Sequence, residues 1–378
     1  MQQLKTLFLT PGCFDKGGVS RYSRYQIDAL ERVVGAGSLR TMSLLGPAAD
    51  SLEGFVKIDW VANGNALRHK AAFALHLLRE ASTWRPRVIH TAHVHLSGLA
   101  IAAARVCGAR TILNTYGCEV WSGMHADASF GLKHTDHVLS DCHATAEYLE
   151  EEQLRPRGTV EVMWDCVDLA RFFPRPPSPD RLRRYALPDP NQHFVLMTLG
   201  RLSHAATYKG YGRLIEVFAR LAPRHAFLRL VIAGDGDLRA DLQRDIAARG
   251  LSGTVVFPGS ISDHDLPDVY RAATLFALIT DRGPSRGEGI PLTPLEAMAC
   301  GVPILVGNQD GSREAVAEQR NGFVLDPFAL DTHAAMIELL IRDPELRGRL
   351  SKGAAEVARE RFSFDAFLQK HRQLYRRL

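Results

Sequence analysis

Residues 287–303 read GEGIPLTPLEAMACGVP, the pattern of a loop, a short helix and the start of a strand. Pro294 suits the first turn of a helix, and Gly301 followed by Pro303 is typical of a helix end. Apolar and β-branched residues then continue through 302–306 (VPILV), which predicts a buried strand. The stretch is therefore one unit in which a helix leads into a strand of a parallel sheet.

The same alternation of short apolar runs and amphipathic stretches extends along the chain. Candidate strands are 4–10, 87–91, 110–115, 136–140, 194–199, 228–233, 254–257, 274–279 and 302–306. Apolar residues at helical spacing are clearest at 211–222, 237–249 and 330–343. This pattern predicts βα units, parallel sheets and an α/β fold.

A proline-rich segment at 172–191 divides the chain into two halves of similar length. Because proline cannot continue a helix or the middle of a sheet, this density predicts a stiff connector. We expect two Rossmann-like domains, at 1–175 and 190–358, that face each other across a cleft. Parallel sheets bind ligands beyond the carboxyl ends of their strands, so the cleft is the expected active site.

The composition excludes several classes of function. Lys and Arg (46) nearly balance Asp and Glu (42), and the net charge of +4 gives no indication of a nucleic-acid partner. No run of about 18 apolar residues occurs and the start lacks a secretory leader, so we expect a cytoplasmic protein without a spanning helix. The six cysteines are scattered, which predicts reduced thiols rather than a zinc site or disulfides. Walker A, G-x-S-x-G and complete G-x-G-x-x-G strings are absent.

Two carboxylates and a set of backbone amides indicate a ligand that carries both phosphate and hydroxyl groups. Glu288 and Glu296 stand eight positions apart, across a loop and the first turns of a helix. Gly287 and Gly289 let backbone amides approach a ligand, and a helix N-terminus favours phosphate. The pattern indicates a nucleotide sugar, with amides for the diphosphate and carboxylates for the sugar hydroxyls. The alternative is that Glu296 only caps or salt-bridges its helix.

Two cations form a second candidate phosphate site. Gly200-Arg201 stands at a strand end, and Lys209-Gly210 precedes the next helix. Such a pair suits a diphosphate, to which each charge-assisted hydrogen bond contributes roughly 1.5–3 kcal/mol. The cations would also stabilise a leaving phosphate without a metal. Solvated surface cations are the alternative for this segment taken alone.

Two other groups of residues could hold a metal. Asp235 and Asp237 form a D-x-D string, which binds a metal in another class of sugar transferases. Asp237 opens a helical stretch, so helix capping is the favoured interpretation. The spacing of His90, His93 and His95 could also suit a metal, but no carboxylate or cysteine partner is obvious nearby. We therefore predict no metal and no cofactor.

Taken together, these motifs resemble glycosyltransferase family 4, a large retaining group with the GT-B fold. Over residues 194–330 the family's usual order appears. It runs from GR and KG through VIAGDGDLRADL, VVFPGSIS and YRAA to EGIPLTPLEAMACGVP. The first half resembles the family more loosely, through GGVSRY at 17–22 and RVIHTAHVHLSG at 87–98. In this fold a final helix, here at 359–378, crosses back to pack on the N-terminal domain.

The resemblance implies roles for individual residues. Arg201 and Lys209 would hold the diphosphate. Glu288 would meet the transferred sugar, and Glu296 would bind the nucleotide ribose. The remaining expected donor contacts are Gly17, Gly18, Gly200, Ile261 in a loop that lines the base, Gly289, Ile290, Pro291 and Leu292. In the mechanism favoured for the family the leaving phosphate takes the acceptor proton, so no protein nucleophile is implied.

One position departs from the family's pattern. Many members carry a histidine in an H-G-x-E/D string near the donor sugar, where this chain has Tyr116-Gly117-Cys118-Glu119. Tyrosine still donates a hydrogen bond but has no second titrating nitrogen, so the donor preference of other members cannot be carried over. We expect Tyr116, Glu119 and His93 to contact the donor or the acceptor.

The leading hypothesis is a metal-independent, retaining hexosyltransferase. It would move a sugar from a UDP- or GDP-linked donor to a sugar or lipid-linked acceptor in polysaccharide or glycoconjugate assembly. The alternatives are a nucleotide-sugar epimerase or phosphorylase of the same fold, and a non-catalytic nucleotide-sugar-binding protein. The basic amphipathic segment 67–85 is interpreted first as a solvated helix packed on its own sheet. Peripheral contact with the inner face of an anionic membrane is the second hypothesis.

Overall fold

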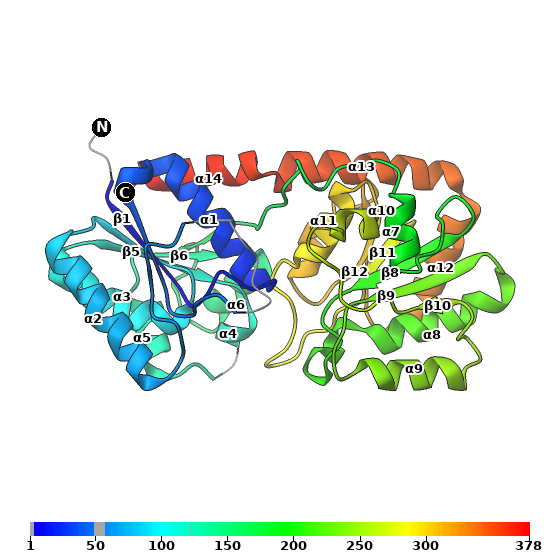
Figure 1. The fold of residues 1–378 in the computed structure, drawn as a ribbon, viewed down its shortest axis with the longest axis horizontal. Helices are drawn as coiled ribbons and strands as arrows, with labels where there is room; N and C mark the ends of the chain where they lie inside the picture. Colours follow the sequence, from blue (N-terminus) through cyan, green and yellow to red (C-terminus); the bar gives the residue numbers. More distant parts are fainter. Residues whose placement is uncertain (1–3, 49–56, 122) are drawn as a thin grey trace. The chain divides into compact units, whose positions relative to one another are not determined.

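The computed structural model describes residues 4–48, 57–121 and 123–378, and the chain divides into two compact units (Figure 1). Unit 1 contains Met1–Cys166 and Phe364–Leu378, and unit 2 contains Val167–Ser363. Each unit is an α/β fold around one parallel sheet. Both sheets are doubly wound, because the strand order reverses between β1 and β4 in unit 1 and between β8 and β11 in unit 2.

The sheet of unit 1 has the order β3-β2-β1-β4-β5-β6-β7. Its strands are β1 (Thr6–Thr10), β2 (Leu39–Ser43), β3 (Trp60–Val61), β4 (Val88–Thr91), β5 (Arg110–Thr115), β6 (His137–Ser140) and β7 (Val160–Val162). Its helices are α1 (Gly18–Val34), α2 (Leu67–Thr83), α3 (Ser97–Cys107), α4 (Cys118–Trp121), α5 (Ala126–His134), α6 (His143–Glu151) and α14 (Phe364–Arg376).

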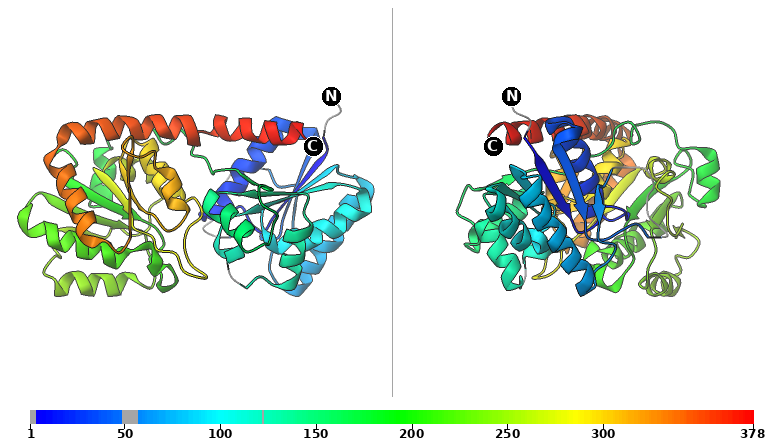
Figure 2. Two further views of the ribbon diagram at one scale, coloured as in Figure 1. Left: turned by 180° about the vertical axis from the view of Figure 1, so that it is seen from behind. Right: turned by 60° about the vertical axis from the view of Figure 1, so that its left-hand side comes forward.

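Alternate residues of β1 face opposite helical layers, as the pleat of a strand requires. Phe8 packs with Ile27 of α1 and Leu368 of α14, whereas Leu7 and Leu9 pack in the cluster formed with α2 and α3. Helices α1 and α14 lie side by side on one face, and α2 and α3 lie on the other (Figures 1 and 2). The unit therefore buries both faces of its sheet, which explains the continuous apolar runs of its central strands.

A buried polar network joins α14 to this sheet. His90, on β4, donates from Nε2 to Asn114 Oδ1 at 3.1 Å and accepts at Nδ1 from the Tyr375 hydroxyl at 3.0 Å. Gln26, on α1, lies 3.4 Å from His371 Nε2 and accepts from the Asn114 amide. Both imidazoles are fully buried. Full burial favours the neutral form of both rings, each with one donating and one accepting nitrogen.

The sheet of unit 2 has the order β10-β9-β8-β11-β12-β13. Its strands are β8 (Phe194–Leu199), β9 (Leu228–Ala233), β10 (Val255–Val256), β11 (Leu275–Leu278), β12 (Ile304–Gly307) and β13 (Gly322–Leu325). Its α-helices are α7 (Pro179–Arg184), α8 (Tyr211–Leu221), α9 (Arg239–Ala248), α10 (Leu266–Arg271), α11 (Leu292–Ala299), α12 (Leu330–Arg342) and α13 (Pro344–Phe362). Two 3-10 helices contribute to the site, η3 (His204–Lys209) and η5 (Gly311–Ala315).

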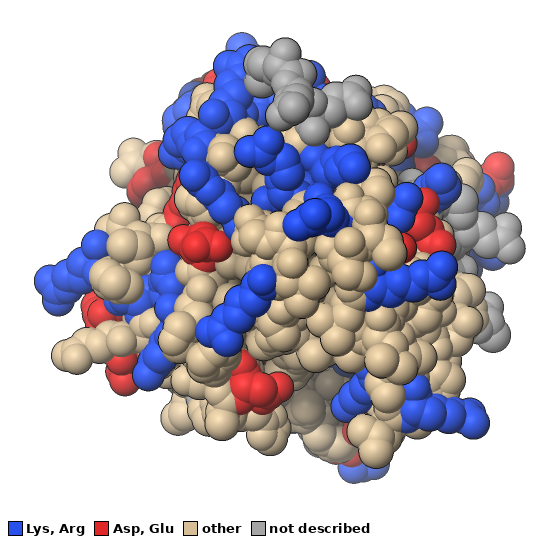
Figure 3. Space-filling view, turned by 90° about the vertical axis from the view of Figure 1, so that its left-hand side faces the viewer, with Lys and Arg blue, Asp and Glu red and all other residues tan. Residues whose placement is uncertain are grey.

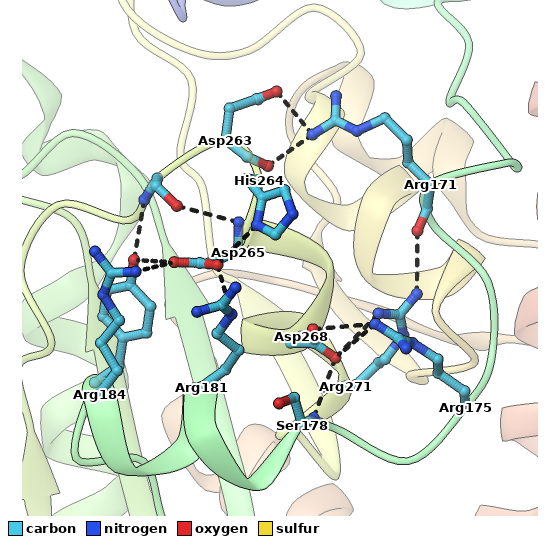
Figure 4. Close-up of polar contacts among 12 residues, drawn as sticks. Arg171, Arg175, Ser178, Arg181, Arg184, Asp263, His264, Asp265, Asp268 and Arg271 are labelled. Carbon is cyan, nitrogen blue, oxygen red and sulfur yellow. Dashed lines mark hydrogen bonds and ion pairs between the residues drawn. The ribbon is translucent and has the colours of Figure 1, made fainter.

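The proline-rich segment expected as a connector is bound to unit 2 by ion pairs (Figure 4). Arg175 pairs with Asp268 at 3.1 Å, and Arg181 pairs with Asp265 at 2.7 Å. The carboxylate of Asp265 is almost fully buried and also accepts from the Tyr185 hydroxyl at 2.9 Å. Unit 2 accordingly begins at Val167, ahead of the prolines. The proline-rich segment is therefore packed against the rest of unit 2 and is not a free linker between the units.

The segment expected as one final helix at 359–378 consists of two pieces. Residues 359–362 are the last turn of α13, which ends at Phe362 and is followed by Ser363 in extended backbone (φ −69°, ψ 153°). Helix α14 then begins at Phe364 and belongs to unit 1. Phe367 and Leu374 of α14 lie in the apolar core of that unit. The break at Ser363 is thus where the chain returns to its first unit.

Candidate functional site

Glu288 lies in the loop between β11 and α11, and its carboxylate meets two side chains of η3. Tyr208 donates a hydrogen bond to Oε1 at 3.0 Å, and Lys209 Nζ forms an ion pair with the same oxygen. The Lys209 and Glu288 side chains are only 16% and 18% exposed. Two residues predicted separately, one for phosphate and one for sugar, are therefore in direct contact.

Gly210 determines how η3 turns into α8 and so how Lys209 is presented. Its backbone is left-handed (φ 80°), and a Cβ there would overlap the carbonyl oxygen of Ile279, which follows β11. Only glycine meets both conditions without strain. This close approach holds the end of η3 against the end of β11. The loop that carries Glu288 follows the same strand.

Gly200 and Arg201 follow β8 at the same edge of the sheet. A Cβ at Gly200 would lie 2.6 Å from the Tyr211 hydroxyl, which instead donates to the Arg201 carbonyl at 3.1 Å. The Arg201 side chain is exposed and makes no hydrogen bond or ion pair within 4–48, 57–121 and 123–378. A guanidinium in this position can bind an anion without breaking an existing contact.

Glu296 lies in the middle of α11 and is 2% exposed. Its Oε2 accepts a hydrogen bond from the buried Tyr270 hydroxyl at 2.8 Å. Pro291 and Cys300 occupy the two ends of the helix, so Glu296 does not cap it. This position disfavours the capping alternative, and the role of Glu296 toward a ribose stays a prediction.

The amides predicted for the diphosphate lie where α11 begins. Pro291 is the N-cap and Leu292 the first residue of this helix. Gly289 is half-buried, whereas Ile290 is almost fully buried. Ile261 is half-buried in the loop after β10, whose Gly259 carbonyl accepts from Gly234 N at 3.0 Å. These positions are compatible with the predicted donor contacts but do not test them.

Both aspartates of the D-x-D string, in the loop after β9, accept hydrogen bonds from backbone nitrogens. Asp237 Oδ1 accepts from the backbone nitrogen of His204 at 3.0 Å, and Asp235 Oδ1 accepts from Gly236 N at 2.9 Å. Helix α9 begins only at Arg239, with Leu238 as N-cap, so the prediction that Asp237 caps this helix is wrong. Gly236, whose φ of 150° favours glycine, precedes the helix, and Asp237 instead accepts from the first backbone nitrogen of η3, whose N-cap is Ser203. Among the described residues, no group of three His, Cys, Asp or Glu could hold a metal.

In unit 1 the glycine-rich loop ends at α1, with Gly17 as N-cap. Asp15 Oδ1 accepts from Gly17 N, and its Oδ2 accepts from Ser20 Oγ at 2.9 Å. A Cβ on Gly17 would lie 2.7 Å from Asp15, whereas Gly18 has nothing within 4 Å of that position. The Gly17 amide is thus already bound to a carboxylate, while Gly18 borders open space.

Tyr116, Glu119 and His93 gather at the carboxyl ends of β4 and β5. Glu119 Oε1 accepts from Tyr116 N, and the rings of His93 and Tyr116 are 6.4 Å apart. Burial raises the pKa of Glu119, and burial with the neighbouring His95 lowers the pKa of His93 to about 4. His90 lies inside the sheet instead, so the three histidines do not converge.

Two residues that contact Glu288 were missed in the sequence. Tyr208 bonds its side chain, and the buried Asp310 accepts from its backbone nitrogen at 2.9 Å. Asp310 lies three residues after the end of β12, as Asp281 lies three residues after the end of β11. A position just beyond a strand end was the sequence feature that could have indicated a site residue. In the sequence, however, an aspartate before a glycine is typical of an ordinary turn.

Residues 183–357 match the family model of glycosyl transferases group 1. This segment is a group 1 glycosyltransferase domain. It contains Arg201, Lys209, Ile261, Glu288 and Glu296, whereas the candidate residues of unit 1 lie outside it.

The chain is also similar to curated proteins. The chain is 31% identical over 243 residues to mannosylfructose-phosphate synthase of Agrobacterium fabrum, which covers 62% of the chain and 51% of that protein. It is 32% identical over 248 residues to the GDP-mannose-dependent alpha-(1-6)-phosphatidylinositol monomannoside mannosyltransferase of Mycolicibacterium smegmatis, covering 64% and 63%. The match therefore spans about half to two thirds of the length of these relatives.

The whole chain, group 1 domain included, has a fold similar to that of Anabaena HepE, solved in complex with UDP. The TM-score is 0.80 at 19% identity, over 99% of this chain and 100% of that one. At this identity the similarity shows the fold alone, which is two Rossmann-like α/β units of the GT-B class.

Proposed function

We propose that the protein transfers a hexose from a UDP- or GDP-linked donor to a sugar or lipid-linked acceptor, with retention of anomeric configuration. The contact of Glu288 with Lys209 and Tyr208, inside the group 1 domain, carries the proposal. It joins a hydroxyl-binding carboxylate to a phosphate-binding cation, the two functions that a nucleotide sugar requires. The relatives that the chain resembles are named as a synthase and a mannosyltransferase, which supports the same class of reaction.

In the proposed mechanism unit 2 binds the donor and unit 1 binds the acceptor. Lys209 has three N–H donors, so it can keep its contact with Glu288 and still bind a phosphate oxygen. Arg201 adds a second cation for the diphosphate. As the bond from the anomeric carbon to the diphosphate oxygen breaks, these cations stabilise the charge that develops on the leaving group.

The acceptor oxygen then bonds to the anomeric carbon on the face that the diphosphate leaves, and its proton goes to the departing phosphate oxygen. Glu288 orients the transferred sugar by accepting from its hydroxyls. The step requires no protein nucleophile, metal or cofactor.

An epimerase, a phosphorylase or a non-catalytic binding protein would keep some of these contacts. Release of the nucleoside diphosphate only when acceptor is present distinguishes a transferase from all three. We therefore propose a screen of UDP- and GDP-linked hexoses for binding, followed by measurement of diphosphate release with and without saccharide acceptors. Binding without turnover for every donor and acceptor would favour the binding protein.

The role of Glu288 is tested by Glu288→Gln. We expect turnover with saturating donor to fall by about 10²-fold, the scale seen when one preorganised polar group is removed from an active site. Glu216→Gln is the matched control, because Glu216 lies in the same unit but forms an exposed pair with Arg220 on α8. Equal turnover of the two variants would remove Glu288 from the reaction.

We also propose that unit 1 contacts the cytoplasmic face of an anionic membrane through α2, α3 and α5. Leu67, Leu75 and Leu78 of α2 are 82%, 69% and 41% exposed, although Phe73 and Leu77 pack the helix onto the sheet. Leu99 and Val106 of α3 and Phe130 of α5 are also exposed. Exposed cations on the same helices are Arg68, Lys70, Arg79, Arg105 and Lys133.

An apolar surface among cations suits an anionic bilayer. Lys and Arg are also spread over the visible end of the molecule, where Asp and Glu are fewer (Figure 3). Among the described helices, none is long and apolar enough to cross a bilayer.

The membrane contact is tested by sedimentation with vesicles of phosphatidylcholine alone or with phosphatidylglycerol. We expect binding to the anionic vesicles only, and a loss of binding in Leu75→Ser. The control is Leu339→Ser, which changes a leucine of unit 2 that is 45% exposed. Equal sedimentation of both variants with the wild type would contradict the assigned face.

A further inference from the structure

Both backbone polar groups of Glu288 are bound by the residues that follow β12. Glu288 N donates to Asp310 Oδ2 at 2.9 Å, and Gly311 N donates to the Glu288 carbonyl at 3.1 Å. The rest of the loop around Glu288 contains an isolated bridge between Gly283 and Arg286 but no helix or strand. These two bonds therefore fix the point from which the Glu288 side chain leaves the backbone.

Asp310 is itself held at the ends of two neighbouring strands. It is fully buried, and its Oδ1 accepts from Thr280 Oγ1 and from Ser312 N, each at 3.0 Å. Thr280 follows β11, and Ser312 belongs to η5 after β12. One carboxylate thus joins β11, β12 and the Glu288 loop.

A local role for Asp310 accounts for only half of its contacts. As the N-cap of η5 it needs one oxygen, which Ser312 N occupies. The second oxygen serves Glu288, which lies 22 positions earlier in the chain. Burying a carboxylate is costly unless donors surround it. Burial raises the pKa of Asp310 to about 6, although hydrogen bonds from Glu288 N and Ser312 lower it. An amide side chain would cap η5, and an apolar side chain would fill the space, each at a lower desolvation cost than a carboxylate. Neither, however, offers two acceptor oxygens.

We propose that Asp310 is a positioning residue of the transfer reaction, which holds the Glu288 carboxylate in place through the Glu288 backbone. The inference rests on the proposed function of Glu288. Asp310 itself touches neither donor nor acceptor in this proposal. Its removal should therefore lower turnover more than donor affinity.

The first test is Asp310→Asn. Asparagine keeps one oxygen, but its NH2 group must then face a donor, either Glu288 N or the pair formed by Thr280 and Ser312. We expect kcat to fall at least tenfold while KM for the donor changes less than threefold. Asp326→Asn is the matched control, because Asp326 Oδ1 accepts from Phe328 N at 2.9 Å in the same kind of local turn. An Asp310→Asn protein with kcat within twofold of the wild type would overturn the proposal.

The second test separates positioning from general destabilisation. If Asp310 acts through Glu288, Asp310→Asn should have little effect on the residual turnover of Glu288→Gln. A variant that merely weakens unit 2 would lower turnover by the same factor in both backgrounds. Equal factors would therefore assign Asp310 to stability alone and reject positioning.

The third test does not depend on catalysis. Hydrogen exchange of the Glu288 amide should be faster in Asp310→Ala than in the wild type or Asp326→Asn, because alanine leaves the amide without its acceptor. Unchanged exchange would refute the inference whatever the activity. A wild type inactive with every nucleotide sugar, but with the expected exchange, would instead refute the proposed function and leave the loop geometry standing.

Discussion

The two buried histidines of unit 1 should make its stability depend steeply on pH, and His371→Gln isolates one of them. Burial lowers the pKa of His90 to about 3 and that of His371 to about 4, from an ordinary value of 6.5. His371 Nδ1 donates to the Phe367 carbonyl at 2.9 Å, so its other nitrogen must accept from Gln26. A proton on Nε2 of His371 would place two donors, the imidazole and the Gln26 amide, face to face.

The magnitude follows from linkage. A histidine whose folded pKa is lowered contributes stability that is present above its unfolded pKa and lost as the pH falls toward its folded pKa. Between pH 7.5 and pH 4.5 the unfolded chain takes up a proton at each histidine, whereas the folded unit does not. At about 1.36 kcal/mol per pH unit below 6.5, each histidine removes about 2.5 kcal/mol, or about 5 kcal/mol together. That is as large as the whole stability of many domains.

Intrinsic fluorescence can measure this in unit 1 alone. All four tryptophans, Trp60, Trp84, Trp121 and Trp164, belong to unit 1. Urea unfolding at pH 7.5 and pH 4.5, followed by tryptophan emission, gives the free energy of unfolding at each pH. We expect the loss between the two pH values to be about 2.5 kcal/mol smaller in His371→Gln than in the wild type. Carboxylates titrate in both proteins and cancel in the comparison.

The control is His125→Gln, because His125 is exposed in the same unit. This variant should lose as much stability as the wild type between the two pH values. If His371→Gln also loses the wild-type amount, the buried imidazole is not neutral in the way the hydrogen bonds require.

Three further predictions concern the site and the domain cores. Turnover should be unchanged by EDTA, because Arg201 and Lys209 supply positive charge to the leaving diphosphate; restoration of a lost activity by manganese or magnesium would revive the metal interpretation of the D-x-D string. Gly210→Ala should lower the melting temperature of unit 2 by several degrees through overlap with the Ile279 carbonyl, whereas Gly212→Ala, inside α8 and in open space, should leave it equal or higher. Deletion of 364–378 should strip α14 from the core of unit 1 and abolish its cooperative unfolding by tryptophan emission, and a normal transition would show that the helix is dispensable.

Strong apolar periodicity made most of the fold predictable from the sequence. Strands β1, β4, β5, β6, β8, β9, β10, β11 and β12 appear where apolar and β-branched runs indicated them, with bounds identical to the predicted ones or within two residues of them. The strands that were not predicted are β2, β3, β7 and β13. Three of these lie at sheet edges, where one neighbour and partial burial require less apolar sequence. β2 (LRTMS) contains only two apolar residues in five positions.

The residue types of the candidate site could be predicted, but their contacts could not. Glu288 and Lys209 are 79 positions apart and meet because β8 pairs with β11 at the reversal of strand order. No local pattern encodes that order. The capping role assigned to Asp237 failed for a related reason, since its partner His204 is 33 positions away. Local propensity located the loops, and only the sheet order determines which loops meet.

The return of the chain to unit 1 affects the order in which the protein can fold during synthesis. Unit 2 is contiguous, from Val167 to Ser363, so all of it is synthesised before α14. Phe367, Leu368 and Leu374 join the core of unit 1 only afterwards. Domains usually fold from the N-terminus onward as they emerge. Here unit 1 is the first unit to be synthesised, but its core is complete only when α14 packs onto it. The apolar surface that α14 covers is therefore the part that a chaperone would have to cover while unit 2 is still being translated.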